Sequence, residues 1–315
     1  MTKILADALV PIFAGLLLGY IAGLRGAMDN NNVQTLITFV MSFAIPSSMF
    51  LSIVTTSRAA LREQVPTALV LLIAYAVLYS GGYFWARYGA NLRASDSSVV
   101  ALTIAFPNSA AVGFTLLASV FGSRSAVAVA MSLAIGSISI SPITLAILEA
   151  NPDSSGGGTS LSRFVNSIVH SFRRPIVWAP LLGLAVSLAG FNLPSFADRS
   201  LAVMGSAAGG SALVLTGLVV SAQSFEIGGN TLVAVLLKNA LQPAVALGFA
   251  MLIHLSIDQM RYVTLINAIP CGFFGVVFGK NFNSSPKVAS SGLIASYAIG
   301  VGTLAAWIVI VNHLR

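Results

Sequence analysis

The chain has 315 residues, of which 57% are hydrophobic and only 8% are charged. A soluble domain carries about 25% charged residues, so this composition excludes a protein that faces water on all sides. The net charge of +7 comes from 16 Lys and Arg residues scattered among short polar segments, a distribution typical of membrane loops, so we expect no nucleic-acid partner.

Apolar runs of about 20 residues recur along the whole chain, and this is the length that crosses roughly 30 Å of hydrocarbon. We therefore predict an all-α membrane protein with ten transmembrane helices. Their predicted ranges are 4–23, 33–54, 65–88, 97–121, 125–149, 174–190, 198–222, 228–257, 260–280 and 287–311.

One long polar segment, 151–173, interrupts this series and contains the run "SSGGGTS". The run lacks the GK[ST] of a phosphate-binding loop, so a flexible linker is the better interpretation. The linker divides the chain into a first five-helix unit, 1–150, and a second one, 174–315.

The two units repeat each other. "PIFAGLLLGYIAGLRG" (11–26) aligns without a gap with "PIVWAPLLGLAVSLAG" (175–190), and "SLAIG" (132–136) aligns with "SYAIG" (296–300), both at an offset of 164. The "AFP" that ends at Pro107 and the "AIP" that ends at Pro270 are offset by 163. Because five is odd, the second unit must run through the membrane inverted. Inverted repeats are typical of secondary transporters.

The fourth and ninth predicted helices both break in mid-membrane, at "FPNSAAVG" (106–113) and "NAIPCGFFG" (267–275). Proline suits the first turn of a new half-helix, so we expect half-helices to begin near Ser109 and Gly272, with crossing at Pro107 and Pro270. Helix N-termini attract anions. The breaks therefore predict a midplane anion site, with Asn108, Asn267 and Cys271 beside it. The alternative is a pair of proline kinks satisfied by neighbouring helices.

Lys238 lies about ten residues into the eighth predicted helix, too deep for easy snorkelling. Ionisable residues at this depth are costly and are functional candidates by default. No predicted helix carries a central Asp or Glu as counter-ion, so a substrate carboxylate is one candidate partner. The alternative is a structural cation that binds half-helix carbonyls, and the two roles are compatible.

Small residues occupy repeat-related places in the second and seventh predicted helices. They are Ser47 and Ser48 after Pro46, and Gly209, Gly210 and Ser211, at an offset of 163. Such residues mark close helix packing, and here they are also candidates for a low wall of the substrate pocket.

An intramembrane enzyme is the main alternative class. The chain has no H-E-x-x-H motif for a metalloprotease, no pair of central carboxylates for an aspartyl protease, and only three His residues for a Ser/His hydrolase. A channel would not explain paired breaks in inverted halves. We therefore expect no catalytic residues, no metal and no cofactor.

The motifs resemble the auxin efflux carrier family over essentially the full length, and within it the bacterial malonate carriers. The stretches that carry the resemblance are "ALVPIFAGLLLGYIAG", "DNNNVQTLITFVMSFAIP", "FPNSAAVGF", "RRPIVWAPLLG", "LLKNALQPAVA" and "GFFGVVFGKNF". "FPNSAAVGFTLL" departs from the family, which often has a proline shortly after that glycine, where this chain has Phe114-Thr115.

This resemblance implies a bile-acid-symporter-like fold with an elevator-type cycle, in which helices 3–5 and 8–10 move against helices 1, 2, 6 and 7. It further implies a homodimer in the lipid of a bacterial inner membrane and a small anionic substrate such as malonate. A different monocarboxylate or an auxin-like weak acid is the alternative substrate, and the coupling ion, sodium or proton, stays open.

The Lys and Arg residues divide almost evenly, eight on the side of the linker and seven on the other. The charge rule therefore decides little about orientation. The resemblance places both termini outside and the 151–173 linker in the cytoplasm.

Overall fold

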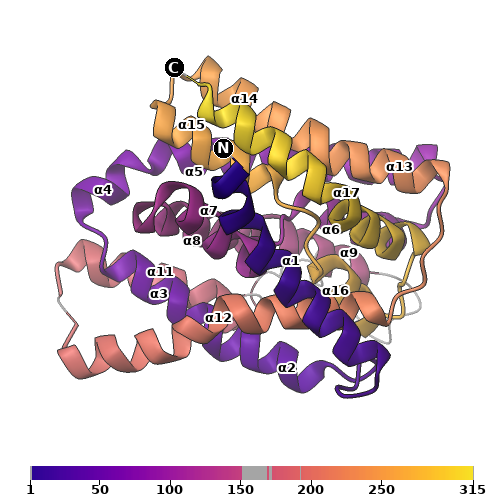
Figure 1. Cartoon of the computed structure of the whole chain (residues 1–315), viewed down its shortest axis with the longest axis horizontal. Helices are drawn as coiled ribbons and strands as arrows, with labels where there is room; N and C mark the ends of the chain where they lie inside the picture. Colours follow the sequence, from indigo (N-terminus) through magenta and orange to yellow (C-terminus); the bar gives the residue numbers. More distant parts are fainter. Residues whose placement is uncertain (1, 151–168, 170–171, 192, 315) are drawn as a thin grey trace.

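The computed structural model describes residues 2–150, 169, 172–191 and 193–314, so nearly all of the predicted 151–173 linker lies outside the described residues. In the described part of the chain, all regular structure is helical apart from one isolated backbone bridge (Figure 1). Seven of these helices are long and apolar enough to cross a membrane, and three shorter apolar helices accompany them. This is the architecture of an all-α membrane protein. Ten membrane passes remain a prediction.

The first half contains nine α-helices and four short π or 3₁₀ segments within the described residues. They are α1 (Thr2–Leu24), α2 (Gln34–Phe39), η1 (Val40–Ala44), α3 (Ile45–Val54), α4 (Arg58–Glu63), α5 (Val65–Phe84), η2 (Trp85–Gly89), α6 (Ala94–Ala105), η3 (Ser109–Gly113), α7 (Phe114–Phe121), η4 (Ser123–Ser125), α8 (Ala126–Ile138) and α9 (Ile140–Glu149).

In the second half, the described elements are α11 (Pro175–Ala189), α12 (Ser195–Ser221), α13 (Gly229–Leu236), η5 (Leu237–Leu241), α14 (Gln242–Leu252), α15 (Ile257–Ala268), α16 (Phe274–Asn281) and α17 (Lys287–Asn312). Each predicted range thus contains helix.

Local sequence sets several helix ends. Ser57 accepts a hydrogen bond from the Ala60 N–H at the start of α4. Ser256 and Gln259 form a reciprocal capping box at the start of α15. Gly190 ends α11 in the left-handed conformation, at φ 77°, which glycine adopts without the steric cost of a Cβ.

We describe the helices in two groups, which also contact each other through η3 on α12 and α7 on α1. α1 packs along α12, and α3 packs against α11 and α12; together with α2 these helices form what we call the peripheral group. α5 packs on α6 and α14, α15 on α14 and α17, and α6 on α9 and α16; we call α5–α9 and α13–α17 the crossing group. In Figure 1, α13, α14, α15 and α17 lie along the upper edge, and α2, α3 and α12 lie along the lower part.

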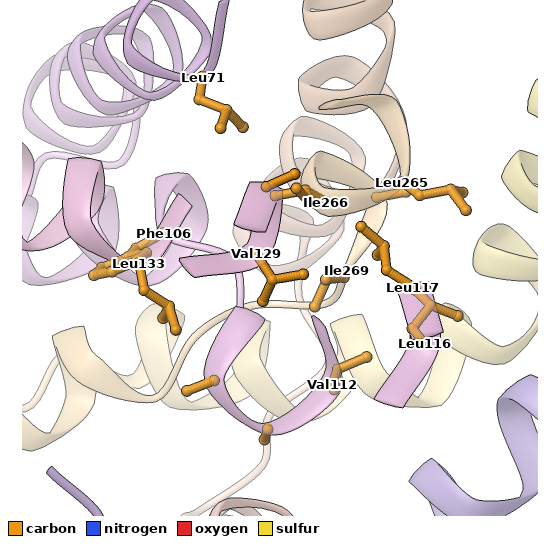
Figure 2. Packing of buried hydrophobic residues seen from close by; sticks show 14 of the residues in the cluster. Leu71, Phe106, Val112, Leu116, Leu117, Val129, Leu133, Leu265, Ile266 and Ile269 are labelled. Atoms are coloured by element: carbon orange, nitrogen blue, oxygen red, sulfur yellow. The ribbon is translucent and has the colours of Figure 1, made fainter. Parts of the chain in front are cut away.

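A buried apolar cluster surrounds the middle of the crossing group (Figure 2). Phe106, Val129 and Ile269 belong to it and are fully or almost fully buried, although they come from three different segments. This cluster excludes water and lipid from the two interrupted helices, so their backbone groups need partners within the protein.

Candidate functional site

The two helix breaks meet in the structure. α6 ends at Ala105 and α15 ends at Ala268, and the segments that follow them pair through an antiparallel backbone bridge between Pro107 and Cys271. Two segments 164 residues apart in sequence therefore cross at the predicted prolines.

Two backbone hydrogen bonds make this bridge. The Asn108 N–H donates to the Pro270 carbonyl at 3.0 Å, and the Gly272 N–H donates to the Phe106 carbonyl at 2.8 Å. Backbone groups freed by each break are thus satisfied by the other break, which hydrocarbon could not do.

Four helix ends converge on the bridge. The C-terminal ends of α6 and α15 point to it with the negative ends of their dipoles, and η3 and α16 begin beside it with positive ends. η3 begins at Ser109, the predicted residue. α16 begins at Phe274, two residues after the predicted Gly272, because Gly272 is engaged in the bridge and Phe273 is the N-cap.

Two glycines allow the breaks to pack closely. A Cβ on Gly300 of α17 would lie 2.8 Å from Cγ of Pro270, and one on Gly136 of α8 would overlap the Phe106 ring. These glycines are the last residues of the matching "SLAIG" and "SYAIG" motifs. The motif match therefore has a physical reason, because the final glycine of each motif leaves space for a residue at a break, Phe106 or Pro270.

Asn108 joins the two helix groups. It is fully buried, and its Nδ2 donates to Thr216 Oγ1 on α12 at 2.9 Å and to the Tyr297 hydroxyl on α17 at 2.5 Å. Its Oδ1 accepts from the Ala111 N–H at 3.4 Å and so caps η3. Sequence reasoning found Asn108 but missed Thr216 and Tyr297.

Serines on α8 and α17 hold the residues that follow each break. The Ser109 hydroxyl lies 2.9 Å from the Ser132 hydroxyl, which in turn lies 2.6 Å from that of Tyr75. The Cys271 N–H donates to Ser296 Oγ at 3.1 Å. Ser132 and Ser296 begin the two matching motifs, so the repeat carried a signal for both that the sequence analysis did not use.

Lys238 lies near the C-terminal ends of α6 and α15, the helices that precede the two breaks. It is fully buried in η5, and its Nζ donates to Gln242 Oε1 at 2.6 Å and to the Asn267 backbone carbonyl at 3.2 Å. Gln242 Nε2 donates to the Ala105 carbonyl at 2.7 Å and to Asn267 Oδ1 at 3.0 Å. Of the two roles left open for Lys238, this geometry fits the structural cation, because Lys238 donates to a carbonyl at the C-terminal end of α15 and binds Gln242, which donates to one at the end of α6. Contact with a substrate remains a prediction.

A cavity of about 850 Å³ opens between the two helix groups. The peripheral group contributes Ser48 and Gly205, and the crossing group contributes Phe114, Arg124 and Tyr262. Ser48, one of the predicted wall residues, therefore lines a space large enough for a small organic molecule.

A second cavity, of about 240 Å³, lies at the opposite end of the same boundary. The α15–α16 segment begins beside the first cavity and ends beside the second, where Lys280 and Asn281 face Asn31 and Gln223. Lys280 Nζ donates to the Asn31 carbonyl at 2.6 Å, which connects the two groups at this end.

The remaining predicted wall residues have different surroundings. A Cβ on Gly209 would lie 3.5 Å from Thr115 Oγ1 on α7, whereas one on Gly210 would meet nothing within 4 Å. Ser47 is half-buried, and the Ser211 hydroxyl donates back to the Ala207 carbonyl of its own helix. Gly209, and not the exposed Gly210, is thus the glycine of this pair that faces the crossing group.

No cluster of three or more His, Cys, Asp or Glu that could hold a metal ion occurs within the described residues. The chemistry of the crossing instead comes from amides, hydroxyls, helix termini and one lysine. Together with the candidate spans, it defines a multi-pass helical membrane protein with interrupted helices bridged at its centre.

Residues 4–308 match the family described as membrane transport protein, and the chain belongs to this family, which includes the auxin efflux carriers. The predicted resemblance to the auxin efflux carrier family is confirmed. An uncharacterized transporter of Escherichia coli strain K12, YfdV, is 27% identical over 306 residues, covering 95% of each chain. An uncharacterized transporter of Methanothermobacter thermautotrophicus is 23% identical and covers 96% of this chain and 97% of its own.

Auxin efflux carrier component 8 of Arabidopsis thaliana is 31% identical over 140 residues, which cover 42% of this chain and 38% of the plant protein. The chain is thus a membrane transporter by family, in line with the prediction that it is not an enzyme.

Proposed function

We propose that this transporter carries a small organic anion, with malonate or a related dicarboxylate as the substrate, through a site at the bridged crossing. The observation that carries the proposal is the meeting of two helix N-termini, those of η3 and α16, beside one backbone bridge. Paired positive dipole ends in a water-poor environment favour an anion over a neutral or cationic solute.

The chemistry around the bridge suits a carboxylate. Each helix dipole contributes about 0.3–1 kcal/mol toward an anion, and up to about 2 kcal/mol where the site is partly buried. Hydrogen bonds from N–H groups to a carboxylate are roughly twice as strong as neutral ones. Among the proposed site residues Asn108, Ser109, Asn267, Cys271 and Gly272, the two amides and the Ser109 hydroxyl would be the donors, because the backbone N–H groups of Cys271 and Gly272 are already bonded to Ser296 and Phe106. Lys238 would supply positive charge close to the site.

An elevator-type cycle follows from the two helix groups. The crossing group would carry the anion past the peripheral group, so that the site faces the 850 Å³ cavity in one state and the 240 Å³ cavity in the other. In the present state the Lys280–Asn31 contact joins the groups at the smaller cavity. This supports a state that is open at the larger cavity.

The proposed architecture is ten membrane helices in two inverted five-helix repeats, 1–150 and 174–315, joined by a cytoplasmic linker. Both termini would then lie outside a bacterial inner membrane, and the carrier would be a homodimer. Labelling a cysteine at Ser155 with an impermeant reagent from outside would contradict the orientation, and a monomer by light scattering in detergent would contradict the dimer.

Uptake of labelled malonate into proteoliposomes tests the proposed substrate, with sodium and pH gradients imposed separately. We expect saturable uptake that other small dicarboxylates inhibit, and the gradient that drives it identifies the coupling ion. Uptake no greater than in liposomes without protein, under either gradient and under none, would contradict the proposal.

A second candidate substrate is an aromatic weak acid. A cavity of about 330 Å³ beside the crossing is lined by Phe13, Tyr20 and Tyr297 among apolar side chains, and Tyr297 binds Asn108. The Arabidopsis relative is named an auxin efflux carrier. Saturable uptake of labelled indole-3-acetate that unlabelled malonate does not inhibit would favour this candidate.

A further inference from the structure

The amide of Asn108 has no hydrogen left to donate in this structure. A carboxamide nitrogen carries two hydrogens. One is directed to the Tyr297 hydroxyl at 2.5 Å and the other to Thr216 Oγ1 at 2.9 Å. A substrate that is to bind this amide must therefore replace one of these two acceptors.

Thr216 and Tyr297 belong to different helix groups. Tyr297 lies on α17, and Asn108 lies between α6 and η3, so both belong to the crossing group. Thr216 lies on α12 in the peripheral group. A movement of one group past the other must break the bond to Thr216 and can keep the bond to Tyr297. Thr216 is thus the replaceable acceptor.

The Thr216 hydroxyl acts on Asn108 purely as an acceptor. Its own hydrogen is committed to the Ala212 carbonyl, at 2.7 Å, one turn back on α12. Only lone pairs therefore face the amide, and a carboxylate oxygen would offer the same kind of group. Both groups are fully buried, so neither can exchange its partner for bulk water.

We propose that Thr216 is a built-in competitor of the substrate, and that a substrate carboxylate binds Asn108 by displacing this hydroxyl. This inference rests on the proposed function. In the empty carrier the threonine satisfies a buried donor and holds the crossing group against α12. In the loaded carrier the carboxylate takes its place, because a charge-assisted hydrogen bond is the stronger of the two. Substrate binding thereby releases one contact between the groups.

Equilibrium binding of labelled malonate, acetate and indole-3-acetate to the purified full chain tests this proposal. Thr216→Val keeps the shape but removes the acceptor, so the empty carrier loses a hydrogen bond that the loaded carrier never had. We expect the dissociation constant of the ligand that binds to fall by about three- to tenfold. Thr216→Ser keeps the acceptor and should bind as the parent does, and Thr216→Ala replaces the valine variant if that one does not fold.

The reference variant is Asn108→Ala, which should lose binding. A merely structural role for Thr216 predicts unchanged or weaker binding in the valine and alanine variants, and that result would overturn the displacement while leaving the site intact. If Asn108→Ala binds like the parent, or if none of the three carboxylates binds the parent, the proposed function fails and the displacement fails with it.

Discussion

Lys238 is the most expensive side chain in the described structure to leave without partners, because it combines a positive charge with complete burial. Its two recorded acceptors, Gln242 Oε1 and the Asn267 carbonyl, connect it to the C-terminal ends of α6 and α15. The lysine therefore compensates two converging negative helix ends, and its position accounts for a charge that lipid alone would exclude.

Replacing Lys238 by alanine should destabilise the protein in the absence of substrate. Each buried acceptor left without a donor costs about 1–3 kcal/mol, and two are affected. A lower melting temperature in detergent would be the readout. The matched control is Lys287→Ala, whose ion pair with Glu226 is exposed and contributes at most about 1 kcal/mol. Equal melting temperatures for the two variants would contradict the structural role.

At the scale of single residues, the sequence alone identifies only those whose type is unusual in an apolar run. Asn108 and Lys238 stand out because amides and charges are rare in apolar runs. Thr216, Tyr297 and Ser132 do not, because hydroxyl side chains are common in membrane helices and can bond to their own backbone. Their role depends on which helix lies opposite, and that is a property of the tertiary packing.

At the scale of elements, each interrupted helix depends on a glycine in a neighbouring helix. Gly136 and Gly300 leave space for Phe106 and Pro270, so α8 and α17 can approach the breaks closely. A side chain in either place would push the break away and lengthen the hydrogen bonds of the bridge.

Replacing Gly300 by alanine should therefore cost about 1–3 kcal/mol through overpacking against Pro270. Gly302 on the same helix is the control, since a Cβ there meets nothing within 4 Å. Alanine at Gly302 should be neutral or stabilise the helix by up to about 1 kcal/mol. Thermal unfolding of both variants checks this, and the account is wrong at this point if Gly302→Ala is the more destabilised one.

The α12 face offers a second comparison of neighbouring glycines. Gly209→Trp should slow transport strongly, because its side chain would enter the boundary with α7 near Thr115. Gly210→Trp projects into open space and should transport at close to the parent rate. Initial uptake rates in proteoliposomes decide between them. A reversed order would mean that the sliding surface lies on another face of α12.

The sequence predicts the breaks well and their details less well. Proline at Pro107 and Pro270 indicates an interruption, because it removes a backbone donor and clashes with the preceding turn. α16 starts two residues after Gly272, because the Gly272 N–H donates to the Phe106 carbonyl in the first half of the chain. A local pattern contains no information about such a partner.

At the scale of the whole molecule, contacts between the two helix groups should form and break during transport. Linking cysteines at Asn31 and Lys280 with a short reducible reagent, in a Cys271→Ser background, should therefore stop uptake, and reduction should restore it. The control pair is at Asn30 and Ser221, which bond at 2.9 Å within the peripheral group. Linking these should leave uptake unchanged. Transport that continues with Asn31 and Lys280 linked would contradict the relative movement.

The arrangement of helices along the chain was accessible from apolar run length, and the two groups were accessible only through the family resemblance. Their packing involves contacts such as α1 on α12 between segments far apart in sequence. Orientation was the least accessible property, because eight basic residues against seven give almost no bias.

The central claim, that a small anion passes through the bridged crossing, is tested most directly by uptake of labelled malonate into proteoliposomes that contain the parent, Asn108→Ala or Asn230→Ala. Asn230 is exposed at the start of α13 and serves as the control. We predict parent-like uptake for Asn230→Ala and at least about a tenfold loss for Asn108→Ala, the size expected when a hydrogen bond to a charged group is removed. Equal uptake by all three proteins would contradict the claim.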